Sequence, residues 1–154
     1  MTLKPGDKLP VLKLPANGDR QIALADYNGR KLVVYFYPKD NTPGCTVEGQ
    51  DFTRLYDDFT AAGADIVGIS KDSVESHDNF VARFDFPFTL LSDTGEAACK
   101  AFDVIKEKSM YGKKYMGVER STFLFDAKGV LRQEWRGVKV KGHAEEVLSA
   151  VKSL

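Results

Sequence analysis

The chain has 154 residues, of which 43% are hydrophobic and 29% are charged. This balance is typical of a globular domain that buries its own core, and it argues against a disordered or membrane-spanning chain. Lysine plus arginine and aspartate plus glutamate number 22 each, so no strong field of either sign would draw the protein to nucleic acid or to an anionic membrane surface. We expect residues 1–154 to form a single domain.

The first ten residues contain no apolar signal-peptide core, and no later segment approaches the roughly 20 apolar residues that span a bilayer. We therefore expect a cytoplasmic protein. The two cysteines make no disulfide framework. Each of them is either a buried packing residue or a reactive thiol.

Residues 31–37 form a near-continuous run of β-branched and aromatic side chains. The run predicts a central strand covered on both faces, and Pro38 ends it. After the turn at Pro43 and Gly44, apolar residues recur at helical spacing until Gly63. The first part of the chain therefore predicts a strand, a short loop and a long helix.

Strand and helix continue to alternate along the chain. Residues 65–70 predict a second buried strand, and a polar helix runs through His77 and Phe84. Residues 88–91 predict a short third strand, and residues 96–102 a further helix.

The lysine-rich, glycine-punctuated segment 106–120 predicts a long loop. Residues 121–126 and 130–135, joined by a turn, predict a β-hairpin, and apolar residues within 144–151 line one face of a closing helix. Right-handed crossovers make the early strands parallel, whereas the hairpin is antiparallel. The sequence therefore predicts the α/β class, with a thioredoxin-like mixed β-sheet flanked by helices.

Cys45 follows the first central strand, at the edge where open α/β sheets usually place their sites. Thr42 suits the N-cap and Pro43 the first helical position, which puts Cys45 in the first helical turn. There, unpaired backbone N–H groups and the positive end of the helix dipole favour a thiolate. The alternative is an unreactive cysteine packed at a helix start. A thioredoxin-like C-x-x-C site would need a second cysteine in place of Thr42.

The segment from Pro38 to Cys45 has the pattern P-x-x-x-T-x-x-C, which resembles the active-site motif of the peroxiredoxins. Within it, Thr-Pro-Gly-Cys-Thr-Val-Glu resembles the branch called peroxiredoxin Q or bacterioferritin comigratory protein. Further matches cover nearly the whole chain, at residues 6–10, 35–38, 92–93, 111–123 and 135. The resemblance implies a peroxiredoxin architecture with a short N-terminal hairpin. It also implies an antioxidant enzyme that reduces hydrogen peroxide and organic hydroperoxides without a cofactor or metal.

The same resemblance assigns roles to the matching residues. Cys45 attacks the peroxide and becomes a sulfenic acid, while Thr42 offers its hydroxyl to the peroxide. Gly44 and Cys45 offer backbone N–H groups, and Arg120 offers its guanidinium to sulfur and peroxide together. Pro38 shields the thiolate from water.

Four polar residues can also be interpreted without the motif. If the motif is ignored, the sequence predicts that Arg120 is a solvated residue at the start of an edge strand. Glu48, one turn beyond Cys45, is expected to orient Arg120, although a glutamate at a helix start is also a favourable dipole contact. His77 and His143 are expected at the surface and show no metal-ligand spacing with the cysteines.

The second half of the catalytic cycle needs a thiol that reduces the sulfenic acid. Relatives of this branch carry a resolving cysteine where this chain has Gln50 or Val81. Cys99 is the remaining candidate, but its small apolar neighbours predict packing against the sheet. We therefore expect a one-cysteine peroxidase reduced by glutathione, glutaredoxin or thioredoxin, and a two-cysteine enzyme resolved by Cys99 as the alternative.

Two further functions compete with this interpretation. One is a thiol-disulfide oxidoreductase on the same fold, which the threonine at position 42 disfavours. The other is a non-catalytic thioredoxin-like binding module or holdase with an incidental cysteine. The resemblance implies a monomer or weak homodimer, with no nucleic-acid or membrane partner.

Overall fold

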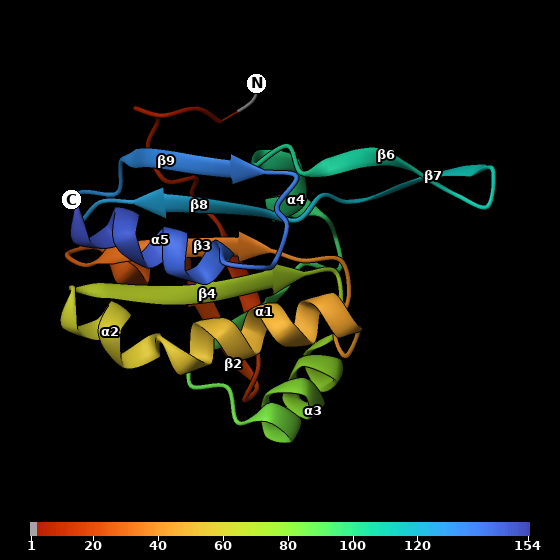
Figure 1. Ribbon diagram of the computed structural model, residues 1–154, viewed down its shortest axis with the longest axis horizontal. Helices are drawn as coiled ribbons and strands as arrows, with labels where there is room; N and C mark the ends of the chain where they lie inside the picture. The colour runs from red at the N-terminus through yellow and green to blue at the C-terminus, as the bar shows by residue number, and fades with distance from the viewer. Residues whose placement is uncertain (1–2) are drawn as a thin grey trace.

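The computed structural model describes residues 3–154. At its centre is a seven-stranded sheet with the strand order β2-β1-β5-β4-β3-β8-β9 (Figure 1). Its strands are β1 (Lys13–Ala16), β2 (Arg20–Ala23), β3 (Lys31–Phe36), β4 (Ala64–Ser70), β5 (Thr89–Ser92), β8 (Ser121–Phe125) and β9 (Leu131–Arg136). Strands β3, β4 and β5 are parallel, whereas β1, β8 and β9 run antiparallel to their neighbours. The predicted mixed sheet and N-terminal hairpin are confirmed.

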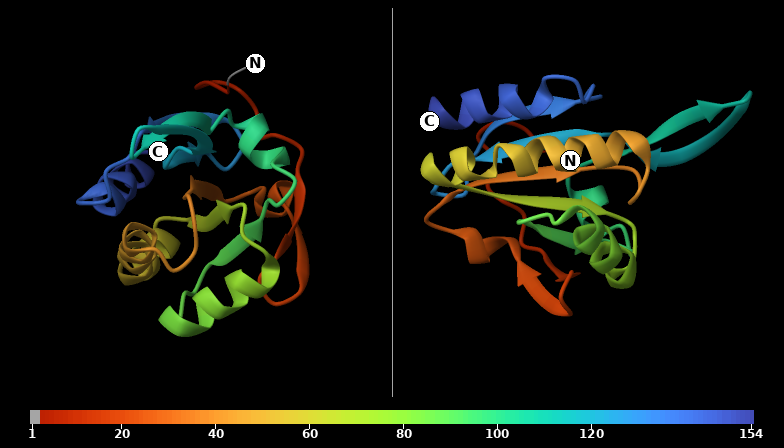
Figure 2. Two further views of the ribbon diagram at one scale, coloured as in Figure 1. Left: turned by 90° about the vertical axis from the view of Figure 1, so that its right-hand side faces the viewer. Right: turned by 60° about the horizontal axis from the view of Figure 1, so that its bottom comes forward.

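Helices cover both faces of the sheet (Figures 1 and 2). They are η1 (Leu24–Tyr27), α1 (Pro43–Arg54), α2 (Tyr56–Ala61), α3 (Val74–Phe84), α4 (Ala97–Ala101) and α5 (His143–Lys152). One apolar core includes side chains of α1, α2, α3 and α5, and the other includes side chains of η1 and α4. The sheet separates these two cores, so a residue in one core faces away from the other.

Strand β3 supplies side chains to both cores in alternation. Leu32, Val34 and Phe36 belong to the core beneath α4, whereas Val33 and Tyr35 belong to the core beneath α1. Successive side chains of a strand point to opposite faces, so a strand covered on both sides is apolar throughout. This burial accounts for the run of residues that predicted the central strand.

The predicted long helix is present with one interruption. Helix α1 ends at Arg54 and α2 begins at Tyr56, while the Leu55 amide still donates to the Asp51 carbonyl over 3.2 Å. Gly63 follows α2 with a positive φ of 83° and leads the chain into β4. A glycine adopts this left-handed conformation without steric cost.

The prediction of a long loop over residues 106–120 is wrong. Strands β6 (Ile105–Met110) and β7 (Lys113–Val118) pair antiparallel and form a hairpin that projects from the body of the molecule (Figures 1 and 2). Its turn consists of Tyr111 and Gly112, both with positive φ. Most of its side chains are exposed, so the sequence lacks the apolar alternation by which a half-buried strand is recognised.

The expectation of surface positions for His77 and His143 is also wrong, because both are buried. His143 shares a hydrogen bond of 2.8 Å between its Nε2 and the Thr122 hydroxyl. Burial lowers the pKa of His143 to about 4, so the ring is neutral at pH 7. The hydrogen-bond partners of both rings lie on elements that are distant in sequence. A local sequence pattern therefore does not show that these histidines are buried.

Candidate active site

The start of α1 places Cys45 at the end of β3. Thr42 is the N-cap residue and Pro43 the first helical residue, as predicted. The first hydrogen bond of the helix runs from the Thr46 amide to the Thr42 carbonyl over 2.9 Å. The amides of Gly44 and Cys45 therefore precede the helical ladder and are not used by it as donors. Cys45 itself is 2% exposed and lies in the core beneath α1.

Arg120 joins the thiol to a buried carboxylate. Its Nη2 donates to Cys45 Sγ over 3.4 Å, and its Nη1 donates to Glu48 Oε1 over 2.7 Å. The guanidinium plane presents several donors in a fixed fork, so one side chain contacts both groups. The Arg120 side chain is only 16% exposed, which keeps water from screening this charge.

Arg120 does not precede an edge strand. It comes directly before β8, which lies between β3 and β9 in the sheet. The interpretation as a solvated arginine at an edge strand is therefore wrong. Because β8 pairs with β3, the chain before β8 is brought beside the end of β3, where Cys45 lies.

Glu48 carries the most strongly perturbed carboxyl of this site. Its side chain is 1% exposed, and burial raises the pKa of Glu48 to about 7, although the charge of Arg120 opposes the rise. Among the residues that the structure describes, Oε2 has no hydrogen-bond partner. With this pKa the carboxyl group is only about half ionised at pH 7, and the contact with Arg120 is what favours its ionised form.

Thr42 and Gly44 lie beside this group, each with a particular contact. The Thr42 hydroxyl does not cap the helix but donates to the Lys39 carbonyl over 2.8 Å. A Cβ on Gly44 would lie 3.1 Å from Arg120 Nη2, so glycine allows the guanidinium to approach the backbone of α1. Pro38 is half-buried at the start of the same loop.

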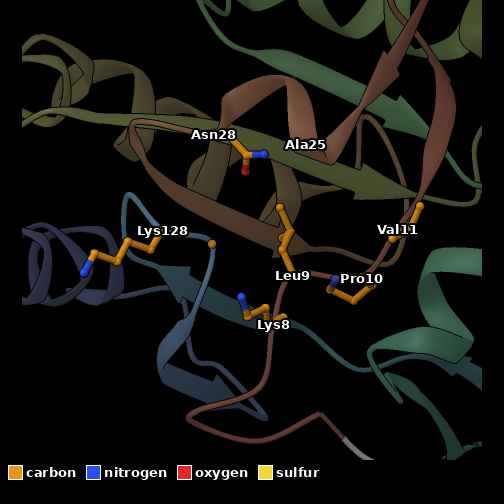
Figure 3. A pocket seen from close by; sticks show the side chains of 8 residues that line it. Lys8, Leu9, Pro10, Val11, Ala25, Asn28 and Lys128 are labelled. Carbon is orange, nitrogen blue, oxygen red and sulfur yellow. The ribbon is translucent and has the colours of Figure 1, made fainter.

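A surface pocket lies away from this group of residues. It has a volume of about 280 Å³ and is lined by residues that include Lys8, Asn28 and Lys128 (Figure 3). Asn28 precedes β3 and Lys128 lies in the turn between β8 and β9, whereas Cys45 follows the other end of β3. Within residues 3–154 no group of three or more acidic, histidine or cysteine side chains could hold a metal ion.

Comparison with known proteins shows the family of the chain. The model of the AhpC/TSA family matches residues 5–134. The chain belongs to this family and is a peroxiredoxin. A curated relative named Peroxiredoxin Bcp, from Xanthomonas campestris, is 57% identical over 93% of this chain and 95% of its own. Peroxiredoxin Bcp of Bacillus subtilis is 47% identical over 100% of this chain and 98% of its own.

Solved structures place this peroxiredoxin in the same branch. A mutant PrxQ from Xylella fastidiosa is 46% identical, with a TM-score of 0.94 over 99% of this chain and 98% of its own. A structure of the bacterioferritin comigratory protein from X. campestris is 53% identical, with a TM-score of 0.89 over 96% of this chain and 98% of its own. That structure comes from a study of the alkyl peroxide reduction activity of the X. campestris protein. These relatives establish the thioredoxin-like fold and a thiol-dependent peroxidase activity.

The second cysteine of this peroxiredoxin lies across the sheet from the first. Cys99 is fully buried in the core beneath α4, whereas Cys45 lies in the core beneath α1. Burial raises the pKa of the Cys99 thiol, and the neighbouring Asp93 carboxylate raises it further. Gln50 is exposed on α1, and Val81 is half-buried on α3.

Sequence reasoning missed two features near the site. Lys108 of β6 is half-buried on the mostly exposed hairpin. Burial lowers the pKa of Lys108, and the nearby positive charge of Arg120 lowers it further. The loop before α1 also holds Asp40, a buried carboxylate that contacts His77. Neither feature has a local sequence signal, because the partners lie 37 residues apart for Asp40 and His77 and on separate elements for Lys108 and Arg120.

No helix within residues 3–154 has the length and apolar character needed to cross a bilayer.

Proposed function

We propose that this peroxiredoxin reduces hydrogen peroxide and organic hydroperoxides through a sulfenic acid at Cys45. The observation that carries the proposal is the bridge in which Arg120 contacts Cys45 Sγ at 3.4 Å and Glu48 Oε1 at 2.7 Å. A guanidinium keeps its charge at working pH, so it favours the thiolate and stabilises the charge that develops on the peroxide. The alkyl peroxide reduction activity of the X. campestris relative supports organic hydroperoxides as substrates.

In the proposed reaction, the Cys45 thiolate attacks one peroxide oxygen in line with the O–O bond. The S–O bond forms as the O–O bond breaks, so sulfur is oxidised and the departing oxygen is reduced. The departing oxygen leaves as hydroxide or alkoxide and takes up a proton, which balances the proton lost when the thiol ionised. Arg120 and the amides of Gly44 and Cys45 stabilise the negative charge during this transfer.

Thr42 orients the peroxide in this mechanism. Its hydroxyl hydrogen is donated to the Lys39 carbonyl over 2.8 Å, which leaves the oxygen free to accept the O–H of the peroxide. Glu48 positions the Arg120 guanidinium through the contact of 2.7 Å. Pro38, half-buried ahead of Thr42, shields the thiolate from water.

For the second half of the cycle, we infer a one-cysteine enzyme that depends on an outside thiol such as glutathione, glutaredoxin or thioredoxin. Cys99 is fully buried and lies on the opposite side of the sheet from Cys45. A disulfide requires Cα atoms within about 7 Å, which the intervening sheet opposes. Because Cys45 is 2% exposed, its sulfenic acid must become accessible before an outside thiol can attack it.

Peroxide turnover with each reductant in turn tests both halves of the proposal. We expect Cys45→Ser to abolish peroxide consumption and Cys99→Ser to leave it intact. One equivalent of hydrogen peroxide should add a single oxygen to the protein mass, and digestion should locate it at Cys45. A disulfide between Cys45 and Cys99 would contradict the one-cysteine mechanism and favour the two-cysteine alternative.

The same preparations discriminate the competing functions. Reduction of insulin would favour a thiol-disulfide oxidoreductase. Alkylation of Cys45 at the rate of an ordinary thiol, without peroxide turnover, would favour a non-catalytic binding module. Sedimentation at micromolar concentrations tests the proposed monomer or weak homodimer.

A further inference from the structure

Asp40 is a buried carboxylate in the loop that leads from β3 to α1. Its Oδ1 accepts from the Tyr37 hydroxyl over 2.6 Å, and its Oδ2 lies 2.7 Å from both the Ser76 hydroxyl and His77 Nδ1. Burial raises the pKa of Tyr37 well above its ordinary value and the charge of Asp40 raises it further, so Tyr37 remains a donor. Two hydroxyl groups donate to this carboxyl group, and the His77 ring shares a third hydrogen bond with it.

His77 lies beneath this carboxylate with both ring nitrogens facing oxygen atoms. The ring is 0% exposed, its Nδ1 faces Asp40 Oδ2, and its Nε2 lies 2.9 Å from the Leu91 carbonyl oxygen. A carbonyl oxygen only accepts, so Nε2 carries a proton, and one further proton is shared between Nδ1 and Asp40 Oδ2. The geometry therefore fixes the His77 ring between the Leu91 carbonyl and the Asp40 carboxyl group.

A buried polar pair of this kind is poorly explained by stability alone. The cost of removing both groups from water offsets the hydrogen bonds that they form, so apolar side chains of similar size are often at least as stable. What the pair supplies is a fixed orientation, since each group is held by directed hydrogen bonds. The group that it orients is the backbone beside Asp40.

The peptide group between Lys39 and Asp40 connects this pair to the peroxide site. Its N–H donates to Asp72 Oδ2 over 2.9 Å, and its carbonyl oxygen accepts from the Thr42 hydroxyl over 2.8 Å. Asp72 also accepts from the Ser70 hydroxyl over 2.6 Å, which holds it at the end of β4. The direction of the Thr42 hydroxyl is thus set by a peptide whose own orientation depends on Asp40.

We propose that His77 is a positioning residue of the peroxide site, which acts through Asp40 on the Thr42 hydroxyl. The His77 ring holds the Asp40 side chain, this side chain fixes the Lys39–Asp40 peptide, and the peptide carbonyl accepts the hydrogen bond from the Thr42 hydroxyl. The Thr42 oxygen then presents a lone pair to the peroxide. This inference rests on the role of Thr42 under the proposed function.

A double-mutant cycle with Thr42→Val tests the inference. The measurement is the second-order rate constant for oxidation of Cys45 by hydrogen peroxide in a single turnover. We expect Thr42→Val to lower it about 10- to 100-fold, and His77→Gln to lower it about 5- to 20-fold, the effect of a misdirected hydrogen bond. In the Thr42→Val background, His77→Gln should change the rate less than about twofold, because no hydroxyl remains to be positioned.

His143→Gln is the matched control, since it alters another buried histidine whose polar partner is Thr122. Its effect on the rate should be the same with and without the Thr42 hydroxyl. An equal loss for His77→Gln in both backgrounds would show a merely structural role and overturn the inference while leaving the peroxidase activity established. If Thr42→Val does not slow the reaction, the proposed role of Thr42 and this inference both fail.

Nitrogen NMR of the unaltered protein provides a test that needs no variant to fold. A proton on His77 Nε2 would support the arrangement in which the ring bridges the Leu91 carbonyl and Asp40. A ring without a proton on Nε2 would overturn the inference, because it could not donate to the Leu91 carbonyl and its contact with Asp40 would not be fixed.

Discussion

Replacing Arg120 by methionine separates the catalytic and structural roles of the Arg120–Glu48 pair. In the native protein Glu48 has a pKa of about 7, against 4.5 for an ordinary glutamate. Without the guanidinium at 2.7 Å, the buried carboxyl loses the partner that holds it ionised, and its pKa rises further. The folded variant then keeps its Glu48 proton at pH 8, whereas the unfolded chain releases it.

The size of the effect follows from proton linkage. A folded-state pKa above the unfolded value makes stability fall as pH rises, and in the native protein this fall stops near pH 7. In the variant Glu48 stays protonated in the folded state above pH 7, so the free energy of unfolding continues to fall by about 1.4 kcal/mol per pH unit. Relative to the native protein, we expect Arg120→Met to lose about 1.4 kcal/mol more stability at pH 8 than at pH 5.

Urea unfolding at the two pH values measures this difference, and Glu48→Gln in the same background is the control. The double variant should lose the pH-dependent part of the destabilisation. Both Arg120 variants should oxidise Cys45 about 100- to 1000-fold more slowly, the usual cost of a lost charge-stabilising donor. An equal stability loss at pH 5 and pH 8, or recovered activity in the double variant, would refute the reasoning.

Three further changes have expected outcomes. A Cβ on Gly49 would lie 2.5 Å from the Phe86 ring, so Gly49→Ala should lower the free energy of unfolding by about 1–3 kcal/mol; an unchanged urea midpoint would contradict this contact. Gly44→Ala should displace the Arg120 guanidinium from Cys45 and slow the oxidation of Cys45 about 10-fold, while stability changes by less than about 1 kcal/mol. An unchanged oxidation rate in this variant would contradict the predicted displacement. His143 has a folded pKa of about 4 against 6.5, so stability should fall by on the order of 2 kcal/mol as pH drops from 6.5 to 4. His143→Gln should remove that part of the acid sensitivity, and an identical pH dependence in the variant would show that the histidine titrates normally.

The sequence was sufficient for features with a local physical cause. The apolar run at 31–37 identified a strand buried on both faces, and Pro43 with Thr42 identified the helix start that holds Cys45. Such patterns are legible because neighbouring residues share one element. The β6–β7 hairpin escaped recognition since its faces are mostly exposed and leave no apolar period.

What the sequence determined by itself is therefore the alternation of the buried strands and the main helices, and the helical position of Cys45. Only the tertiary structure decided which distant groups meet there, because pairing of β3 with β8 carries Arg120 to Cys45 across 75 positions of sequence. It likewise buried His77 against Asp40 and put Cys99 on the other side of the sheet. These contacts depend on sheet pairing and packing between elements, which no local periodicity encodes.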